Sequence, residues 1–370
     1  MIGVLHAYSR TNSGDGLLVD LTLARLARQG VAPDDVVLVA LDADSFPEVP
    51  RRVHVGTRGR GLGWELVPAA GRACGLGLSA ALRRPVGGPG RELARCDAFV
   101  AVGGGYLRAV DVTSSLGTTL NHLPQLAAAA RSRKRSLYLP QSVGPLRGPV
   151  GAAVRRGLAG VGAVCVRDPW SAADLARLDR VHEIPDLAVL DLAESAAVVE
   201  RVPAGGRIGF VARHVGHAAG YEAHVQAVAR KLGERAVWAV QTAGDPTKSD
   251  AVHYQRLGLT PGGALVDMLA ARELSVVVSV RLHGALMALR AGVPAVHLAY
   301  DRKGPAAFAD LGLQEWCLDV RSLDGAKLRA AVEAVADDPD AYWDRFTDRV
   351  APLAAASQRL DALVAETVGC

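Results

Sequence analysis

An arginine and a histidine directly follow a β-branched, strongly apolar stretch in the last third of the chain. Residues 275–280 predict a buried strand, and Arg281 and His283 stand between that strand and a helical apolar spacing over 283–291. Ligands of open α/β sheets bind where strands end at their carboxyl side, and a helix N-terminus there favours an anion. A permanent cation beside a titratable imidazole suits phosphate or carboxylate chemistry.

Two further cations follow predicted strands in the same part of the chain, Arg213 and Lys303. Arg281 suits a bidentate clamp for an anion, or alternatively an ion pair with a local acid. His283 suits a general acid, or alternatively a cap of the helix start. Lys303 is equally consistent with a phosphate contact and with a solvated side chain. The sequence therefore predicts an anion site in which Arg281 and His283 are the main candidates.

The first half of the chain carries small and polar residues at comparable places, after predicted strands. They are Asn12, Asp15, Gly104, Gly105, Gln141 and Ser142. Asp15 either caps the first helix or orients, or deprotonates, an acceptor hydroxyl. Adjacent glycines let backbone approach a ligand, but they do not form G-x-G-x-x-G, so a dinucleotide site is unsupported.

Strands alternate with helices along most of the chain, which predicts an α/β fold with parallel sheets. We expect strands at 2–8, 36–41, 97–102, 135–140, 162–166, 207–212, 236–241, 275–280 and 295–299, and helices at 16–29, 118–131, 149–159, 171–178, 220–232, 262–272 and 283–291. Residues 191–206 interrupt this alternation and predict a linker. The expected domains are 1–190, 207–330, and a helical tail over 331–370 whose last helix begins at Pro339.

Several motifs resemble those of the polysaccharide pyruvyltransferase family, and they come in family order. They are Asn12-Ser13-Gly14-Asp15, Gly103-Gly104-Gly105, Gln141 to Pro145, Val166-Arg167-Asp168 with Ser171, Arg281-Leu282-His283 with Ala285-Leu286, Ala291 to Pro294, and Tyr300-Asp301 with Lys303. The resemblance implies a GT-B-like fold, with two Rossmann-like domains facing a central cleft and the tail packing back on the first. Pro140 stands where the family usually has glycine, and this departure concerns the acceptor pocket.

The resemblance also implies a reaction, the transfer of pyruvate from phosphoenolpyruvate to paired hydroxyls of a sugar in a surface glycan or its lipid-linked precursor. Donor binding would then fall to Arg213, Arg281, His283 and Lys303, with His283 and Asp15 catalytic. The acceptor would contact Asn12, Asp15, Gly104, Gly105, Gln141 and Ser142. We expect no cofactor and no metal, since arginines can neutralise the donor. The alternatives are a nucleotide-sugar glycosyltransferase and a non-catalytic glycan-binding protein.

Two other patterns near strand ends are weaker. His214, His217 and His224 include an H-x-x-H spacing, but Gly216 interrupts it, so a metal site is not indicated. Gln241 and Asp245 follow a further predicted strand and are lesser candidates for ligand contacts.

Composition limits the compartment and the class of partner. The net charge of +4 is modest, so nucleic-acid binding is unsupported. Five scattered cysteines without C-x-x-C argue against a disulfide scaffold or structural zinc. The N-terminus reads as a strand, and no run of about 18 apolar residues occurs, so we expect a cytoplasmic protein. Residues 72–91 mix leucines with arginines, which suits either a surface loop-helix or peripheral membrane contact.

Overall fold

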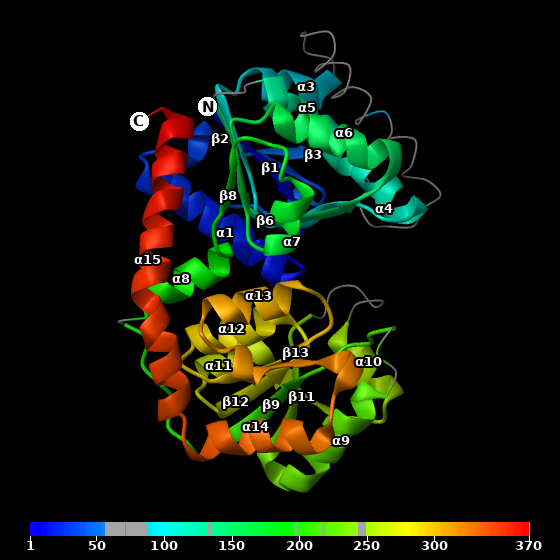
Figure 1. Cartoon of the computed structure of the whole chain (residues 1–370), viewed down its shortest axis with the longest axis vertical. Coiled ribbons are helices and arrows are strands. Elements are labelled where there is room, and N and C mark those ends of the chain that lie inside the picture. The colour runs from blue at the N-terminus through cyan, green and yellow to red at the C-terminus, as the bar shows by residue number, and fades with distance from the viewer. Residues whose placement is uncertain are drawn as a thin grey trace. The chain divides into compact units, whose positions relative to one another are not determined.

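The computed structural model (Figure 1) describes residues 1–55, 71, 87–131, 135–196, 198–216, 218, 220–242 and 249–369. The chain forms two compact units. Unit 1 consists of Met1–Arg10, Asp15–Leu187 and Ala356–Cys370, and unit 2 consists of Thr11–Gly14 and Ala188–Ala355. Each unit has its own parallel sheet, so the structure confirms the expected α/β class with two Rossmann-like domains.

Among the described residues, the sheet of unit 1 has the order β3-β2-β1-β4-β6-β7-β8, with β5 paired to β6. Its strands are β1 (Ile2–Ala7), β2 (Val36–Ala40), β3 (Arg51–His54), β4 (Ala98–Ala101), β5 (Gly104–Ala109), β6 (Ser136–Leu146), β7 (Ala163–Val166) and β8 (Val181–Glu183). Its helices are α1 (Ser13–Arg28), α3 (Gly87–Ala94), α4 (Val112–Gly117), α5 (Leu123–Arg131), α6 (Gly148–Ala159) and α7 (Pro169–Asp174).

The described sheet of unit 2 has the order β11-β10-β9-β12-β13-β14, which is the doubly wound Rossmann order. Its strands are β9 (Arg207–Val211), β10 (Ala236–Val240), β11 (Pro261–Ala264), β12 (Leu274–Ser279), β13 (Ala295–Ala299) and β14 (Cys317–Asp319). Its helices are α8 (Leu187–Ser195), α9 (Tyr221–Leu232), α10 (Asp250–Arg256), α11 (Leu265–Ala270), α12 (Leu282–Arg290), α13 (Lys303–Asp310), α14 (Gly325–Asp337) and the first part of α15 (Asp340–Val368).

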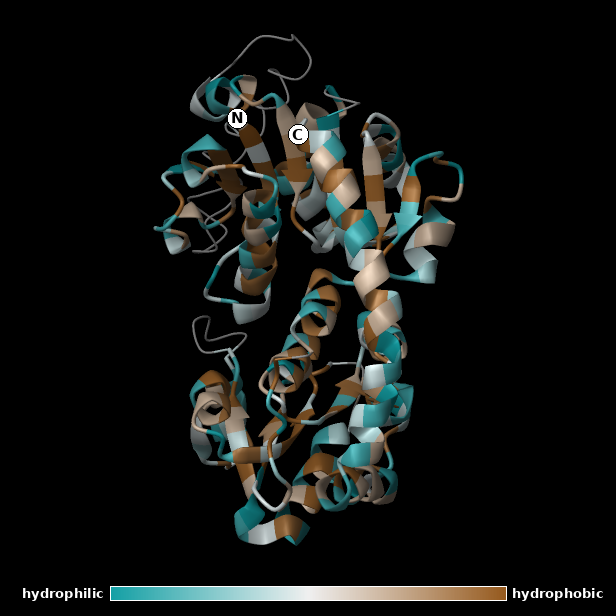
Figure 2. Cartoon of the chain, turned by 90° about the vertical axis from the view of Figure 1, so that its left-hand side faces the viewer, coloured by the Kyte–Doolittle hydropathy of each residue, from teal (hydrophilic) through white to brown (hydrophobic). Residues whose placement is uncertain are grey.

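The central strands are buried on both faces. Every residue of β1, β2, β12 and β13 is buried, and Figure 2 shows the hydrophobic colour gathered on the strands. Strands covered on both faces read as continuous apolar runs without polar alternation. This is why residues 36–40 and 274–279 were recognisable as strands from the sequence.

The structure corrects the expected positions of four residues in unit 1. Gln141 and Ser142 were expected beyond a strand that ends at 140, but β6 continues to Leu146. Gly104 and Gly105 were expected after a strand that ends at 102, and they do follow β4, but they begin a further strand, β5. The strand passes through its proline because β5 pairs with its second half, where Gly104 lies opposite Gln141.

The long helix α15 contributes to both units. Its residues up to Ala355 belong to unit 2, and those from Ala356 onward belong to unit 1. There, Arg25 of α1 is only 3% exposed and donates to Asp361 at 2.6 Å and to Ser357 at 2.9 Å. The last turns of the chain therefore satisfy a buried charge of unit 1.

None of the described helices combines the length and apolar character that a membrane crossing requires. Of residues 72–91, the structure describes only 87–91, where α3 begins. The expected membrane contact of that segment therefore concerns residues that, for the most part, lie outside the described ones.

A buried ion pair between Arg167 and Asp186 generates a stability prediction. The side chains are 4% and 2% exposed, and the Nε of Arg167 donates to Ser142 at 3.1 Å. We expect Asp186→Ala to lower the free energy of unfolding by about 3–5 kcal/mol, because Arg167 would remain buried without its charge partner. Urea denaturation measures this change.

The matched control is the half-exposed pair of Arg207 with Glu273, whose charged atoms lie 3.5 Å apart. Glu273→Ala should cost no more than about 1 kcal/mol, because water already screens both charges. Equal losses in the two variants would contradict the structural role assigned to Asp186.

Candidate functional site

Two predicted cations of unit 2, Arg213 and Arg281, lie at the point of the sheet where its strand order reverses. Strands β9 and β12 are neighbours there. Strands β10 and β11, which follow β9, lie on one side of this pair, and β13 and β14, which follow β12, lie on the other. Arg213 follows β9, and Arg281 follows β12 as the N-cap residue of α12. In doubly wound sheets this switch point is the usual place for a ligand.

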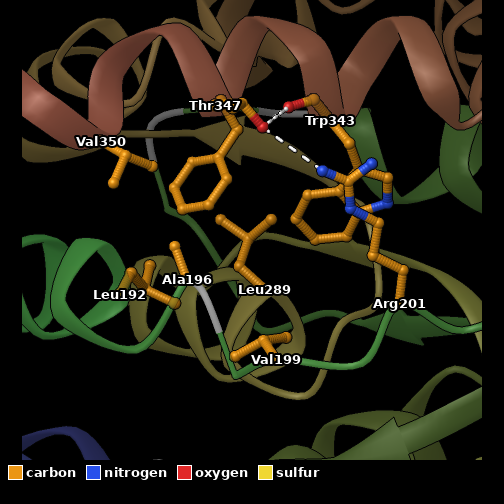
Figure 3. A pocket seen from close by; sticks show the side chains of 9 residues that line it. Leu192, Ala196, Val199, Arg201, Leu289, Trp343, Thr347 and Val350 are labelled. Atoms are coloured by element: carbon orange, nitrogen blue, oxygen red, sulfur yellow. Dashed lines mark hydrogen bonds between the residues drawn. The ribbon is translucent and has the colours of Figure 1, made fainter.

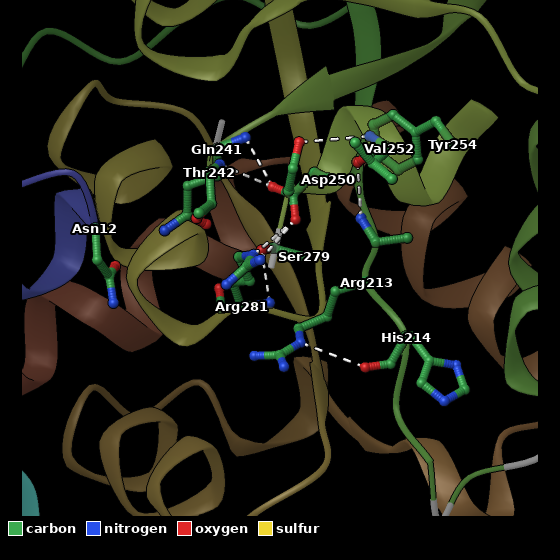
Figure 4. Close-up of polar contacts among 12 residues, drawn as sticks. Asn12, Arg213, His214, Gln241, Thr242, Asp250, Val252, Tyr254, Ser279 and Arg281 are labelled. Carbon is green, nitrogen blue, oxygen red and sulfur yellow. Dashed lines mark hydrogen bonds and ion pairs between the residues drawn. The ribbon is translucent and has the colours of Figure 1, made fainter. Parts of the chain in front are cut away.

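Asp250, the first residue of α10, holds the guanidinium of Arg281 (Figure 4). Its Oδ1 accepts from Nε of Arg281 at 2.9 Å and from Nη2 at 2.7 Å. Its Oδ2 accepts from the backbone N–H groups of Gln241 and Thr242 at 3.0 and 2.9 Å. The Asp250 side chain is 0% exposed and that of Arg281 is 11% exposed, so this pairing fixes where the guanidinium points.

Helix α10 was not anticipated from the sequence, and its anchor explains why it can carry Asp250. Tyr254, one turn along α10, is fully buried, and its hydroxyl donates to the carbonyl of Ala239 at 2.8 Å. The same hydroxyl accepts from the backbone N–H of Ala212 at 3.0 Å. The only sequence signal was Ser249 before Asp250, because serine commonly caps a helix start, as Ser249 does here.

The turn between β12 and α12 is also fixed by side chains. The hydroxyl of Ser279 donates to the carbonyl of Arg281 at 2.7 Å, and Nδ1 of His297 contacts the carbonyl of Ser279 at 2.8 Å. A Cβ atom added at Gly284 would collide with Gln241 and Ser279. The glycine in the Arg281-to-Leu286 motif is therefore required by close packing.

His283 lies in the first turn of α12, against the Asn12–Gly14 segment. That segment belongs to unit 2, and a Cβ atom added at Gly14 would collide with the imidazole. Asn12 accepts a hydrogen bond from the N–H of Gly14 at 3.2 Å. The structure thus brings two predicted site residues, Asn12 and His283, into one small region.

Arg213 stacks on an aromatic ring in the same unit. Its guanidinium carbon lies 5.5 Å from the ring centroid of Tyr300. Burial, followed by the charge of Asp301, raises the pKa of Tyr300, while the charges of Arg213 and Arg281 act in the opposite direction. Both arginines therefore act on the same hydroxyl. Among the described residues, no carboxylate forms an ion pair with Arg213.

The other candidates of unit 2 are less closely involved. Lys303 begins α13 and lies 3.9 Å from Asp301, with its side chain 35% exposed. His214 is largely exposed, 3.8 Å from Glu222. Within the described residues, no three His, Cys, Asp or Glu side chains gather as a metal site would require. His217 and Asp245 lie outside the described residues.

In unit 1 the predicted polar residues have different roles. Ser142 accepts from buried Arg167, which is a structural role. Gln141 is 0% exposed, and among the described residues neither atom of its amide has a hydrogen-bond partner. A buried amide without a partner is costly and favours a site that receives a polar group. Asp15 lies in the first turn of α1, and its charge acts on Tyr8.

A separate concave pocket of about 280 Å³ in unit 2 has an apolar character (Figure 3). It is lined by Leu192, Ala196, Val199, Arg201, Leu289, Trp343, Phe346, Thr347 and Val350. Arg201 stacks 5.5 Å from the ring centroid of Trp343 and donates to Thr347 at 3.3 Å. Its lining suits a hydrocarbon group rather than a phosphate, so the switch point is the better anion site.

Comparison with known proteins supports a specific family. The family model described as polysaccharide pyruvyl transferase matches residues 12–241. Among curated protein sequences, none matches this chain significantly.

Similar solved structures define the fold. A UDP-GlcNAc 2-epimerase from Methanocaldococcus jannaschii has 11% identity and a TM-score of 0.54, with 91% of this chain and 93% of that chain covered. A UDP-GlcNAc 2-epimerase from Neisseria meningitidis, bound to UDP-GlcNAc, has 11% identity and a TM-score of 0.54 over 97% and 98%. LpCGTa, in complex with UDP, has 15% identity and a TM-score of 0.52 over 99% of both chains. The fold is GT-B-like, and at these identities the likeness extends to the fold alone.

The contact between His297 and the Arg281 turn generates a pH prediction. Burial lowers the pKa of His297 to about 4 from an ordinary value of 6.5. The unfolded chain therefore binds a proton between these values that the folded chain does not, so stability is lost as pH falls from 6.5 toward 4. By linkage, this loss is about 3 kcal/mol from His297.

His297→Asn should remove this part of the pH dependence, because the amide nitrogen can replace Nδ1 as donor to Ser279 but does not titrate. Urea denaturation at pH 7 and pH 4.5 measures the difference in each protein. If wild type and variant lost equal stability between the two values, His297 would not be buried in its neutral form.

Proposed function

The chain belongs to the polysaccharide pyruvyl transferase family, and we propose that it transfers pyruvate from phosphoenolpyruvate to two hydroxyls of one sugar. The product is a cyclic ketal on a cell-surface glycan or its lipid-linked precursor. The observation that carries the donor assignment is Arg281, oriented by buried Asp250, near Arg213 at the switch point of unit 2.

The charges of this site fit a donor with a phosphate and a carboxylate. Asp250 neutralises part of the charge of Arg281 but holds its guanidinium in one direction, which lowers the cost of ordering it on binding. Arg213 adds a positive charge that no described carboxylate neutralises. The start of α12 adds backbone N–H groups that favour an anion.

The reaction requires one acid and two nucleophilic hydroxyls. The methylene carbon of phosphoenolpyruvate gains a proton, and the first sugar hydroxyl adds to the central carbon as it loses its own proton. The C–O bond to phosphate then breaks, and the second hydroxyl adds and loses its proton to close the ketal. We assign proton delivery to His283, which follows Arg281 by two residues in the first turn of α12. Asn12 and Asp15 are the proposed contacts near the acceptor hydroxyls, and Lys303 is a further donor contact.

Substitutions at Arg281 and His283 separate binding from proton transfer. Arg281→Ala should weaken phosphoenolpyruvate binding by roughly 2–5 kcal/mol, because the anion loses its paired cation. Arg281→Lys should recover only part of this, since a lysine keeps the charge but not the planar fork that Asp250 orients. His283→Gln should reduce turnover by roughly 10²–10⁴ while changing donor affinity much less.

Calorimetric donor affinity and single-turnover rates, measured side by side, test these assignments. Normal turnover in His283→Gln would remove its role as the acid. Phosphoenolpyruvate should raise the melting temperature of the wild-type protein, whereas nucleotide sugars should not. The reverse pattern would favour the glycosyltransferase alternative.

Catalysis should not depend on a divalent metal. The described residues present no cluster of metal ligands, and two arginines at the switch point can neutralise the donor. Turnover should therefore survive EDTA. Activity that is lost on chelation and restored by magnesium or manganese would contradict this proposal.

A further inference from the structure

Four aromatic side chains of unit 1 form a continuous hydrogen-bonded chain at the end of β1. His6 contacts the hydroxyl of Tyr138 through Nε2 at 2.8 Å and Nδ1 of His122 through its own Nδ1 at 3.2 Å. Nε2 of His122 contacts the hydroxyl of Tyr8 at 3.0 Å. Strands β1 and β4 are neighbours where the strand order of this sheet reverses. These four hydrogen-bonded side chains therefore lie at the switch point of unit 1.

The backbone of His6 is held in an unusual conformation. Its φ angle is +65°, in the left-handed region that non-glycine residues seldom adopt. The register of β1 with β2 shifts between Val4 and Ala7, and the N–H of His6 donates to Gln125 at 2.8 Å. Such a conformation costs free energy and is found most often at functional sites.

The imidazoles of His6 and His122 are both neutral at physiological pH. Burial lowers the pKa of His6 well below its ordinary value and that of His122 to about 3. A neutral imidazole has one N–H and one lone pair. The contact between the two Nδ1 atoms therefore needs one donor and one acceptor, which leaves only two possible directions for the whole chain of hydrogen bonds.

The burial of Tyr138 excludes one of these two directions. Tyr138 is fully buried, and among the described residues its hydroxyl has His6 as its only hydrogen-bond partner. If Nε2 of His6 carried a proton, the Tyr138 hydroxyl would accept it and its own proton would have no acceptor, which is costly in a buried site. Tyr138 therefore donates to His6, His6 donates to His122, and His122 donates to Tyr8.

Tyr8 is the last residue in this series of hydrogen bonds. None of the other three side chains accepts the proton of its hydroxyl. Burial, followed by the charge of Asp15, raises the pKa of Tyr8, so its hydroxyl keeps that proton. Tyr8 is half-buried, unlike His6, His122 and Tyr138. Its hydroxyl is therefore a hydrogen-bond donor whose direction is fixed by three buried partners.

We propose that Tyr8 binds the acceptor by donating a hydrogen bond to a sugar hydroxyl oxygen, an identification of the ligand that rests on the proposed function. A neutral donor surrounded by aromatic rings suits an uncharged polyhydroxyl ligand. The ring of Tyr106 stacks on His6 with centroids 4.6 Å apart. Gln141, in the same strand as Tyr138, has a buried amide without a hydrogen-bond partner among the described residues.

These four hydrogen-bonded side chains serve to bind the sugar and not to deprotonate it. Burial lowers the pKa of His122 far below neutrality, so His122 is a poor proton acceptor. His6 and Tyr138 act as positioning residues, because they set the direction of the Tyr8 proton without touching the ligand.

The tautomers of the two histidines test the direction without any enzymatic assay. In the full-length chain labelled with ¹⁵N-histidine, NMR should show His6 protonated on Nδ1 and His122 protonated on Nε2. The signals are assigned by their loss in His6→Asn and His122→Gln. The opposite tautomers would mean that Tyr8 donates inward, and would overturn the proposal even if pyruvyl transfer were established.

Three tyrosine-to-phenylalanine variants test the ligand contact. Tyr8→Phe should raise the acceptor KM about three- to ten-fold with the donor KM unchanged, as expected for one lost hydrogen bond. Tyr138→Phe should raise it less, because Tyr8 can then also turn its proton inward. Tyr106→Phe is the matched control, since its hydroxyl donates to the carbonyl of Val102 at 2.8 Å, outside the chain.

The assay measures phosphate release from phosphoenolpyruvate with methyl glycosides of glucose, galactose, mannose and their N-acetylamino forms. An unchanged acceptor KM in Tyr8→Phe, or an equal rise in Tyr106→Phe, would overturn the proposal. If wild type released no phosphate with any glycoside, the proposed function would fail, and saturation-transfer NMR with the same glycosides would then decide. Equal signals in wild type and Tyr8→Phe would exclude the Tyr8 contact.

Discussion

The buried carboxylate of Asp250 is the constraint on which the site of unit 2 depends. One of its oxygens binds two backbone N–H groups beyond β10, and the other binds the guanidinium of Arg281 beyond β12. A single side chain thus ties two strand ends and one functional cation together. A charge buried to this extent is tolerated only when it is fully hydrogen-bonded, so the geometry around Asp250 leaves little freedom to Arg281.

The two units have different kinds of polar group at their switch points. Unit 2 uses charges, and it orients a cation with a carboxylate. Unit 1 uses neutral groups, a row of two imidazoles and two phenols at the end of β1. The first arrangement suits an anionic ligand and the second suits an uncharged one, as the proposed reaction between a charged donor and a sugar would require.

The sequence was most informative where one residue type implies one physical role. Buried parallel strands are continuous apolar runs, and cations after such runs are recognisable, so the sheets and the positions of Arg213 and Arg281 at strand ends could be predicted. Asp250 could not, because its role comes from α10, a short helix placed by the buried hydroxyl of Tyr254. His6 and His122 lie 116 positions apart, and no spacing rule connects them. Pro140 read as a strand end because the pairing of β5 with β6 is not visible locally.

The helix α15 has a consequence for the order in which the chain is made. Unit 1 contains the first residues of the chain and also Ala356–Cys370. A ribosome synthesises these residues only after all of unit 2, so Arg25 has no access to Asp361 and Ser357 until that part of α15 has been made. The described strands of both sheets precede that point, since β8 ends at Glu183 and β14 ends at Asp319. Vectorial synthesis therefore produces the described strands of both sheets before the buried charge of Arg25 can gain its partners.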